Sequence, residues 1–151
     1  MTTLTIRQGD PRHPQATALL EASHALMQSL FPAESNFYLS IDALCEESIH
    51  FFVVERDGDT VGCAALAVKD GYGEVKSMFV YPAARGTGAA GMLMQQIDSH
   101  ARDLGLPVIK LETGPGLDAA HKLYHRHGFE LCGAFGDYPE SPYSVFMQKV
   151  F

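Results

Sequence analysis

One stretch of the sequence restricts the possible folds most strongly, and it runs from Val80 to Gly91. A strand-like segment stops there at Pro82, glycines recur over the next residues, and a helix-like pattern follows at 92–104. The first turn of a helix leaves backbone N–H groups without partners, and glycine lets the backbone approach a ligand closely. Strand, glycine-rich turn and helix start together predict a site for an anion such as a phosphate.

The glycine spacing excludes one phosphate loop and leaves two interpretations of this stretch. No Lys-Ser or Lys-Thr pair follows the last glycine, so the stretch is not a Walker loop. Gly86, Gly88 and Gly91 fit G-x-G-x-x-G, but the strand before them belongs to a hairpin region, whereas a dinucleotide fold needs a strand–helix–strand unit. Arg85 would add a forked cation at the rim of an anion site. A turn that only starts a helix remains the alternative.

Hydrophobic periodicity predicts the order of the elements along the chain. Strands are expected at 4–6, 51–54, 61–68, 74–80, 108–111, 129–135 and 144–150. Helices are expected at 15–30, 42–47, 92–104 and 117–127. Asp57-Gly58 predicts a tight hairpin turn. Hairpins in the first half and strand–helix–strand units in the second predict one mixed α/β sheet with helices on both faces.

Length, composition and charge narrow the class of protein. The chain has 151 residues, of which 46% are hydrophobic, and we expect one domain over residues 1–151. A net charge of −7 argues against a non-specific nucleic-acid binder and favours cationic substrates. Three scattered cysteines fit no metal or redox spacing and indicate a reducing, cytoplasmic compartment. Neither a leader peptide at 1–12 nor a membrane-spanning stretch is expected.

Three short motifs stand in a fixed order in the second half of the chain. The strand before the glycine-rich turn ends in V-Y-P at 80–82, residues 85–90 read R-G-T-G-A-A, and residues 120–129 read A-H-K-L-Y-H-R-H-G-F. In these motifs the chain resembles the GCN5-related N-acetyltransferases, the GNAT family, whose patterns are V-x-P, Q/R-x-x-G-x-G/A and A-x-x-L-Y-x-x-x-G-F. The tail, 133–139 and 144–147, is also similar to a subgroup of uncharacterised bacterial members.

The resemblance implies a fold and a reaction. The fold would be a single mixed, mostly antiparallel seven-stranded sheet flanked by helices on both faces, the acyl-CoA N-acyltransferase fold. The reaction would move an acetyl group from acetyl-CoA to a primary amine by direct attack, without an acyl-enzyme and without a metal. One position departs from the family pattern: many members carry Asn seven residues before the tyrosine of the third motif, where this chain has Leu117. A CoA contact made by that Asn is therefore absent here or made by another group.

The resemblance also implies which residues hold the cofactor. The pyrophosphate would lie on Arg85, Gly86, Thr87, Gly88, Ala89 and Ala90. The pantetheine arm would pair with the backbone of Met78, Phe79 and Val80, and Tyr124 would lie near its sulfur. In the family this strand commonly carries a bulge and splays from the next strand, leaving a V-shaped cleft. A backbone N–H near Phe79 or Val80 would stabilise the oxyanion.

Two proton transfers need side chains. Tyr124 matches the family's general-acid tyrosine; the alternative is an aromatic side chain that only packs beside the cofactor. Glu74 is the expected base, acting through water, and the alternative is an exposed carboxylate at a strand end. Glu112, at the end of the next strand, is the rival base or a group that binds a cationic substrate.

Other side chains are candidates for contacts with the amine acceptor. The expected acceptor-binding residues are His24, Glu34, Glu112, Tyr138 and Tyr143. A partly packed histidine and ordinary surface loops are the alternatives for these positions. His121 and His125 have the spacing of metal ligands on a helix, but no acid or cysteine accompanies them, so a solvated histidine face is expected and no metal site.

Two classes of function remain for this chain. The leading one is an acetyl-CoA-dependent N-acetyltransferase that acts on a small-molecule or peptide amine, without nucleic-acid or membrane partners. The alternative is a non-catalytic module that binds acyl-CoA as a sensor or regulator. The protein is expected to be a monomer or a homodimer, with the last strand, 144–150, as a possible edge for the dimer.

Overall fold

The computed structural model describes residues 3–151; Met1 and Thr2, the start of the segment expected to carry no leader peptide, lie outside it. The strands are β1 (Leu4–Gln8), β2 (Ile49–Arg56), β3 (Asp59–Val68), β4 (Gly73–Val80), β5 (Val108–Thr113), β6 (Glu130–Cys132) and β7 (Val145–Val150). The helices are α1 (Pro14–Leu30), α2 (Ile41–Leu44), α3 (Ala89–Asp103) and α4 (Asp118–Arg126), with 3-10 turns η1 (Ala33–Ser35) and η2 (Pro82–Ala84).

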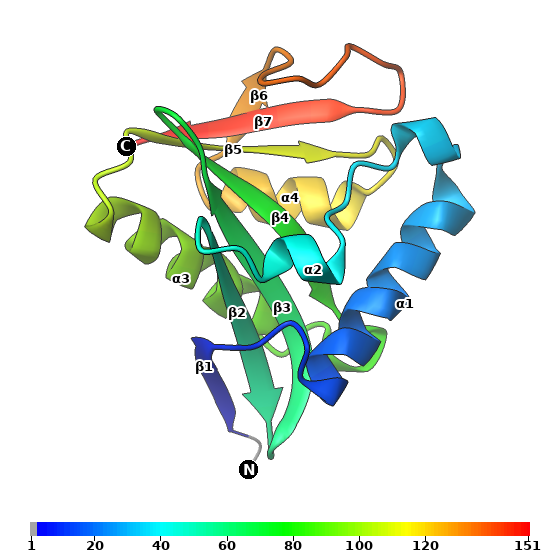
Figure 1. Ribbon diagram of the computed structural model, residues 1–151, viewed down its shortest axis with the longest axis vertical. Coiled ribbons are helices and arrows are strands. Elements are labelled where there is room, and N and C mark those ends of the chain that lie inside the picture. The colour runs from blue at the N-terminus through cyan, green and yellow to red at the C-terminus, as the bar shows by residue number, and fades with distance from the viewer. Residues whose placement is uncertain (1–2) are drawn as a thin grey trace.

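The seven strands form one sheet in the order β1-β2-β3-β4-β5-β7-β6 (Figure 1). Neighbouring strands run antiparallel except β4 and β5, which run parallel. The predicted mixed, mostly antiparallel sheet is confirmed. The hairpin between β2 and β3 turns at Asp57 and Gly58, whose φ angles of 52° and 88° are those of the tight turn that matches strand twist.

Helices cover both faces of the sheet, as predicted (Figure 1). One hydrophobic cluster joins α3 and α4 to the sheet, and the second joins α1 and α2 to the opposite face of β2 and β3. Strand β2 shows the division residue by residue, because Phe52 and Val54 belong to the first cluster and Phe51 and Val53 to the second. Side chains of successive strand residues point to opposite faces, so an uninterrupted apolar run is what a central, doubly covered strand requires.

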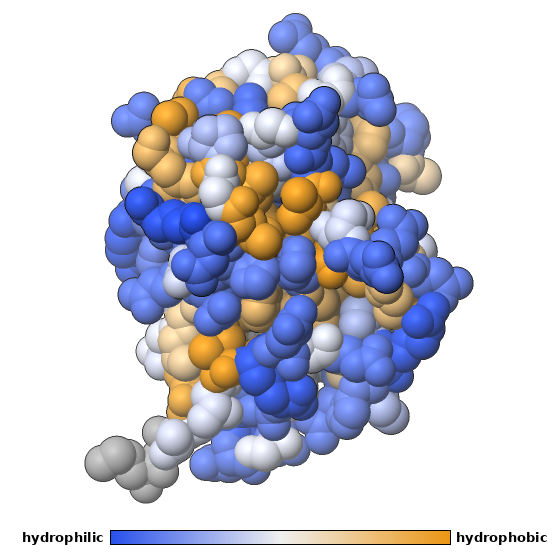
Figure 2. Space-filling view, turned by 60° about the vertical axis from the view of Figure 1, so that its left-hand side comes forward, coloured by the Kyte–Doolittle hydropathy of each residue, from blue (hydrophilic) through white to orange (hydrophobic). Residues whose placement is uncertain are grey.

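The outer surface carries little continuous hydrophobic area on the side where α3 lies. Figure 2 turns this side forward and shows hydrophobic residues in small groups between hydrophilic ones. Leu104, directly after α3, is 45% exposed. Isolated exposed apolar side chains of this kind are ordinary on a folded protein.

Some expected elements differ from the observed ones. The strand predicted at 129–135 is only three residues long, β6, because the chain turns away after Cys132. The last strand is not an edge: β7 lies between β5 and β6, so the expectation of a free edge at 144–150 is wrong. Helix α2 has four residues instead of the six expected at 42–47, since Cys45 already follows its last turn.

Candidate active site

Strands β4 and β5 separate after a short contact and leave a cleft. Only two residue pairs join them, Gly73 with Ile109 and Glu74 with Lys110. Beyond these pairs lies a cavity of about 160 Å³, lined by β4, the end of β5, parts of α1 and α4, and the segment 31–38. The cleft expected from the resemblance is therefore present.

A bulge in β4 marks the point where the strands part. Cys63 of β3 lies opposite Phe79, whereas Ala65, two residues later, lies opposite Lys76, so β4 holds one extra residue. Within the bulge Ser77 has a φ of 55°, and such a left-handed conformation costs a non-glycine residue on the order of 1–3 kcal/mol. The Ser77 carbonyl accepts a hydrogen bond from the Cys63 thiol at 3.2 Å.

The strand after the bulge presents backbone groups to the cleft. The Tyr81 N–H donates to the Val61 carbonyl of β3 at 2.9 Å. Because N–H groups alternate between the two edges of a strand, the Val80 N–H points to the opposite edge, toward the gap. Of the two expected oxyanion donors, Phe79 and Val80, this alternation favours Val80.

The glycine-rich turn lies between η2 and α3. Gly86 and Gly88 have φ angles of 78° and 92°, and a Cβ built on either would have no atom within 4 Å. Gly88 is the N-cap residue of α3, and no side chain occupies the N–H groups at the helix start. Thr87 donates its hydroxyl hydrogen to the Ala84 carbonyl, which holds the turn closed. The turn thus exposes backbone donors at a helix N-terminus, as an anion site requires.

Tyr124 lies on α4 and lines the cavity. Burial, together with the nearby Glu112 charge, raises the pKa of Tyr124 to about 12. The phenol is therefore protonated near neutral pH and is able to donate a hydrogen bond.

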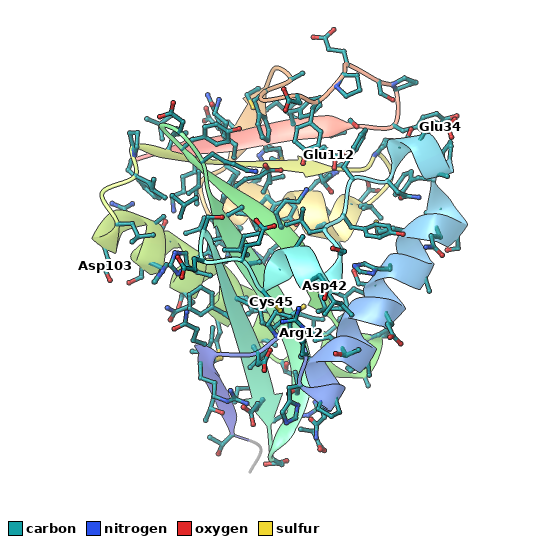
Figure 3. The ribbon with its side chains drawn as sticks, viewed as in Figure 1. Arg12, Glu34, Asp42, Cys45, Asp103 and Glu112 are labelled. Atoms are coloured by element: carbon teal, nitrogen blue, oxygen red, sulfur yellow. The ribbon has the colours of Figure 1, made fainter. Side chains whose placement is uncertain are left out.

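Glu112 also lines the cavity, at the end of β5 (Figure 3). Its carboxylate accepts a hydrogen bond from the Ser144 hydroxyl at 2.8 Å. Burial raises the pKa of Glu112, the Ser144 hydrogen bond and the Lys76 charge oppose this rise, and the Glu74 charge adds to it. A carboxyl whose pKa lies above the usual value is better matched to proton abstraction near neutral pH.

Glu74 is placed differently from Glu112. It is 4% exposed and does not line the cavity, so the alternative of an exposed strand-end carboxylate is wrong. Its Oε2 accepts a hydrogen bond from the Tyr138 hydroxyl and lies 3.4 Å from the Lys76 ammonium. Burial and the Glu74 carboxylate together raise the pKa of Tyr138. Glu74, Lys76 and Tyr138 form one polar network, in which Lys76 lines the cavity and Glu74 lies behind it.

The expected acceptor-binding residues lie at different distances from the cavity. Tyr143 lines it, and Tyr138 reaches it through Lys76, to which its hydroxyl is bonded at 2.8 Å. His24 is not in the lining, but it stacks on Tyr38, a lining residue, with ring centroids 4.0 Å apart. Glu34 is exposed on η1 at the outer end of the molecule and does not line the cavity (Figure 3).

Sequence reasoning missed several lining residues, among them Phe31, Phe37, Lys76 and Ser77. The phenylalanines follow a helix in a segment without periodicity, so no pattern marked them. Lys76 stood in a strand next to a candidate carboxylate, and this was the one signal available in the sequence. Leu117, which replaces the common Asn, adds an apolar side chain to the lining.

The two helix histidines each contact the backbone. The His121 Nε2 lies 2.9 Å from the Gly114 carbonyl, and the His125 Nδ1 lies 3.0 Å from the Phe129 carbonyl. Within residues 3–151, no group of three or more potential ligands is arranged to hold a metal ion. In the same part of the chain, no helix combines the length and apolarity that crossing a bilayer would need.

Comparison with known proteins identifies the family. The model of the acetyltransferase (GNAT) family matches residues 16–129, and the chain belongs to this family of acetyltransferase enzymes. An IAA acetyltransferase of Azospirillum brasilense is 40% identical over 151 residues, which cover 99% of each chain.

Solved structures agree with this assignment. A crystal structure from Klebsiella pneumoniae, assigned as an acyl-CoA N-acyltransferase, has a TM-score of 0.82 at 29% identity and covers 98% of this chain and 97% of its own. The PaiA N-acetyltransferase of Thermoplasma acidophilum, solved with coenzyme A, has a TM-score of 0.73 at 14% identity over 99% of each chain. At that identity the likeness concerns the fold.

Proposed function

We propose that this protein transfers an acetyl group from acetyl-CoA to a primary amine of a small molecule or peptide. The observation that carries the proposal is the cavity between β4 and β5, which Glu112 and Tyr124 line together. One group suited to accept a proton and one suited to donate a hydrogen bond face the same space. The proposal treats residues 1–151 as a single N-acetyltransferase domain.

The donor would be held mainly by backbone groups, with one charged side chain at the rim. The N–H groups of the turn, from Arg85 to Ala90, would bind the pyrophosphate, with the Arg85 guanidinium at the rim. The backbone of Met78, Phe79 and Val80 would pair with the pantetheine arm along the open edge of β4. This arrangement points the thioester toward the bulge and the cavity.

The proposed reaction is a direct attack. The acceptor ammonium loses a proton to the base through water, and its nitrogen attacks the thioester carbonyl. A C–N bond forms, the C–S bond breaks, and the Val80 N–H stabilises the oxyanion between these steps. After the attack the nitrogen loses its second proton, which goes to the departing sulfur, so the products are the amide and the CoA thiol. Tyr124 donates a hydrogen bond to that sulfur, and its raised pKa keeps the phenol protonated for this role.

We propose Glu112 as the base and retain Glu74 as the alternative. Glu112 faces the cavity and has a raised pKa, whereas Glu74 is bonded to Tyr138 and lies beside Lys76 behind the wall. A proton could still reach Glu74 through Tyr138, so both carboxylates belong in the test.

The proposal includes a cytoplasmic location, a monomer or homodimer, and no nucleic-acid or membrane partner. Free cysteines at 45, 63 and 132, within the described part of the chain, agree with a reducing compartment. The net charge of −7 agrees with a cationic acceptor. A non-catalytic acyl-CoA sensor with the same fold is the competing function, and turnover of any amine would eliminate it.

The first experiment is calorimetric titration with acetyl-CoA, 3′-dephospho-CoA and ATP. Acetyl-CoA should bind with a micromolar dissociation constant, and ATP should bind much more weakly. Release of the CoA thiol with amines then measures turnover, and Tyr124→Phe should lower kcat more than it weakens acetyl-CoA binding. A folded protein that does not bind acetyl-CoA would overturn the proposal.

A further inference from the structure

The charge balance around the cavity indicates which kind of amine it suits. Of the cavity-lining residues within 3–151, Lys76 and Glu112 are the two with charged side chains. The Lys76 ammonium donates to the Phe37 carbonyl and to the Tyr138 hydroxyl, each at 2.8 Å, and lies 3.4 Å from the Glu74 carboxylate. An ammonium has three hydrogens, so three acceptors already match its donors. Lys76 is therefore occupied within the protein.

Glu112 is in the opposite state. It has one hydrogen bond, from Ser144, although a carboxylate offers about four acceptor positions. The Glu74 carboxylate offsets the Lys76 charge. The cavity therefore has an excess negative charge, which comes from Glu112. A ligand ammonium gains a partner at Glu112. A ligand carboxylate would be repelled by Glu112, and the Lys76 ammonium in the cavity lining is already bonded to protein groups.

Aromatic side chains form much of the remaining wall. Phe31, Phe37, Tyr38 and Tyr143 line the cavity. The Phe37 ring packs edge-on against the Tyr138 ring, with centroids 5.2 Å apart, whereas Tyr143 is 43% exposed. The Phe31 ring lies directly over Gly114, where even a Cβ would come within 2.2 Å of the ring. His24 stacks on Tyr38, and Gln28 donates to its hydroxyl at 2.7 Å. An aromatic wall of this kind favours a flat apolar body.

We propose that the acceptor is a primary amine carried by a flat, apolar body and without a carboxylate beside the amine. Its ammonium binds at Glu112, and its ring packs against the aromatic wall of Phe31, Phe37, Tyr38 and Tyr143. This inference rests on the proposed function, because it describes the acceptor of the same transfer reaction. It separates arylalkylamines, which the cavity accepts, from aromatic α-amino acids, which it disfavours.

Matched pairs of acceptors test the inference with the wild-type protein. Phenethylamine is compared with phenylalanine and tyramine with tyrosine, with kcat/KM measured by thiol release from acetyl-CoA. The amine without a carboxylate should be favoured at least about tenfold in each pair, which corresponds to one unfavourable charge interaction of about 1.4 kcal/mol. Phenylalaninamide is the control for bulk, and it should behave like phenethylamine. Equal or better use of the amino acids would overturn the inference.

A variant tests the role assigned to Lys76. Glu74→Gln keeps the shape of the network and removes the charge that offsets Lys76, so it should narrow the preference within each pair. An unchanged preference in a folded variant would contradict the part given to Glu74 and Lys76. If the variant does not fold, the wild-type pairs still decide the inference.

Failure of this inference can be told apart from failure of the proposed function. If acetyl-CoA binds but no amine releases thiol, the transfer reaction fails. Calorimetry with CoA-loaded protein then still compares phenethylamine with phenylalanine. Binding of phenylalanine at least as tight as that of phenethylamine would overturn the inference by itself.

Discussion

Glu74 and Glu112 belong to neighbouring strands, yet their surroundings give them different chemistry. Glu74 is enclosed with Lys76 and accepts a hydrogen bond from Tyr138. Glu112 faces the cavity, and its pKa is raised by burial. Glu74 is therefore bonded within the protein, whereas Glu112 faces the space in which a ligand can bind. At this scale the role of a residue follows from its partners.

The first prediction compares the two carboxylates. Glu112→Gln should lower kcat/KM by about 100-fold or more, the range for loss of a general base, and Glu74→Gln by less than about tenfold. As the pH is lowered, the kcat/KM of the wild type should fall with a midpoint above the usual pKa of a glutamate. The reason is that Glu112, whose pKa is raised, must be deprotonated to act as the base. Acetyl-CoA affinity, measured by calorimetry, serves as the control for folding. A larger decrease in kcat/KM for Glu74→Gln than for Glu112→Gln would instead indicate Glu74 as the base.

Among the elements, the start of α3 depends most directly on glycine. Gly88 has a left-handed conformation and caps the helix without a side chain. Gly71, in the turn between β3 and β4, has a similar φ of 84° and also has open space around its Cβ position. The two glycines therefore share their backbone requirement, and they differ in whether a helix N-terminus follows.

The second prediction compares substitutions at Gly88 and Gly71, which share a left-handed backbone conformation. Gly88→Val should weaken acetyl-CoA binding by at least about tenfold, since a branched side chain would cover the donors, and the strained backbone should cost on the order of 1–3 kcal/mol of stability. Gly71→Val should cost similar stability and leave the affinity unchanged. Calorimetry and urea unfolding measure the two effects. Equal affinities for both variants would show that the turn does not bind the donor.

Most elements could be predicted because their patterns are local. The apolar spacing of α1 and α3 and the hairpin at Asp57-Gly58 agree with the structure to within a few residues. A bulge in β4 was expected from the family resemblance, but its position at Ser77 could not be predicted, because a serine in a strand gives no sign of a positive φ. The length of β6 also escaped prediction, since its apolar residues continue beyond its last pairing with β7.

The candidate site was predictable only in part. Tyr124 and the glycine-rich turn are carried by motifs, and their roles in catalysis and cofactor binding stay predictions. The contact between Glu74 and Tyr138 joins residues 64 positions apart, and no sequence period reports such a contact. Phe31 and Gly114 are also far apart in the sequence and in contact in the structure. The aromatic wall of the cavity could therefore not be predicted from the sequence.

For the whole molecule, partly buried histidines link stability to pH. The His50 and His100 rings lie 4.4 Å apart between the sheet and α3, and His100 packs against Phe52. Burial, and then the neighbouring His100, lower the pKa of His50 below its usual 6.5. Burial also lowers the pKa of His24 and His127. Folding thus favours the neutral forms of His24, His50 and His127.

The third prediction follows from the sign of these shifts. A histidine whose pKa is lowered by folding stabilises the fold fully above about pH 6.5, and this contribution is lost as the pH falls below that value. The urea midpoint should therefore decrease between pH 7 and 5, and the decrease should be smaller for His50→Gln. Glu112, whose pKa is raised, contributes a pH dependence of stability of the opposite sign, and this contribution is the same in the wild type and in His50→Gln. The difference between their two curves of urea midpoint against pH therefore reports the contribution of His50. Parallel curves would contradict the prediction.

The cavity is built from two kinds of segment. The proposed donor side consists of β4, β5 and α4, which are tied into the core, whereas much of the proposed acceptor wall comes from the connection at 31–38 and from Tyr143 in a loop. Substitutions in connections usually cost less stability than substitutions in core elements. A lineage of such proteins can therefore change its acceptor through replacements in these two connections while the transfer chemistry stays intact. Evolution of new specificity, and its engineering, should begin there.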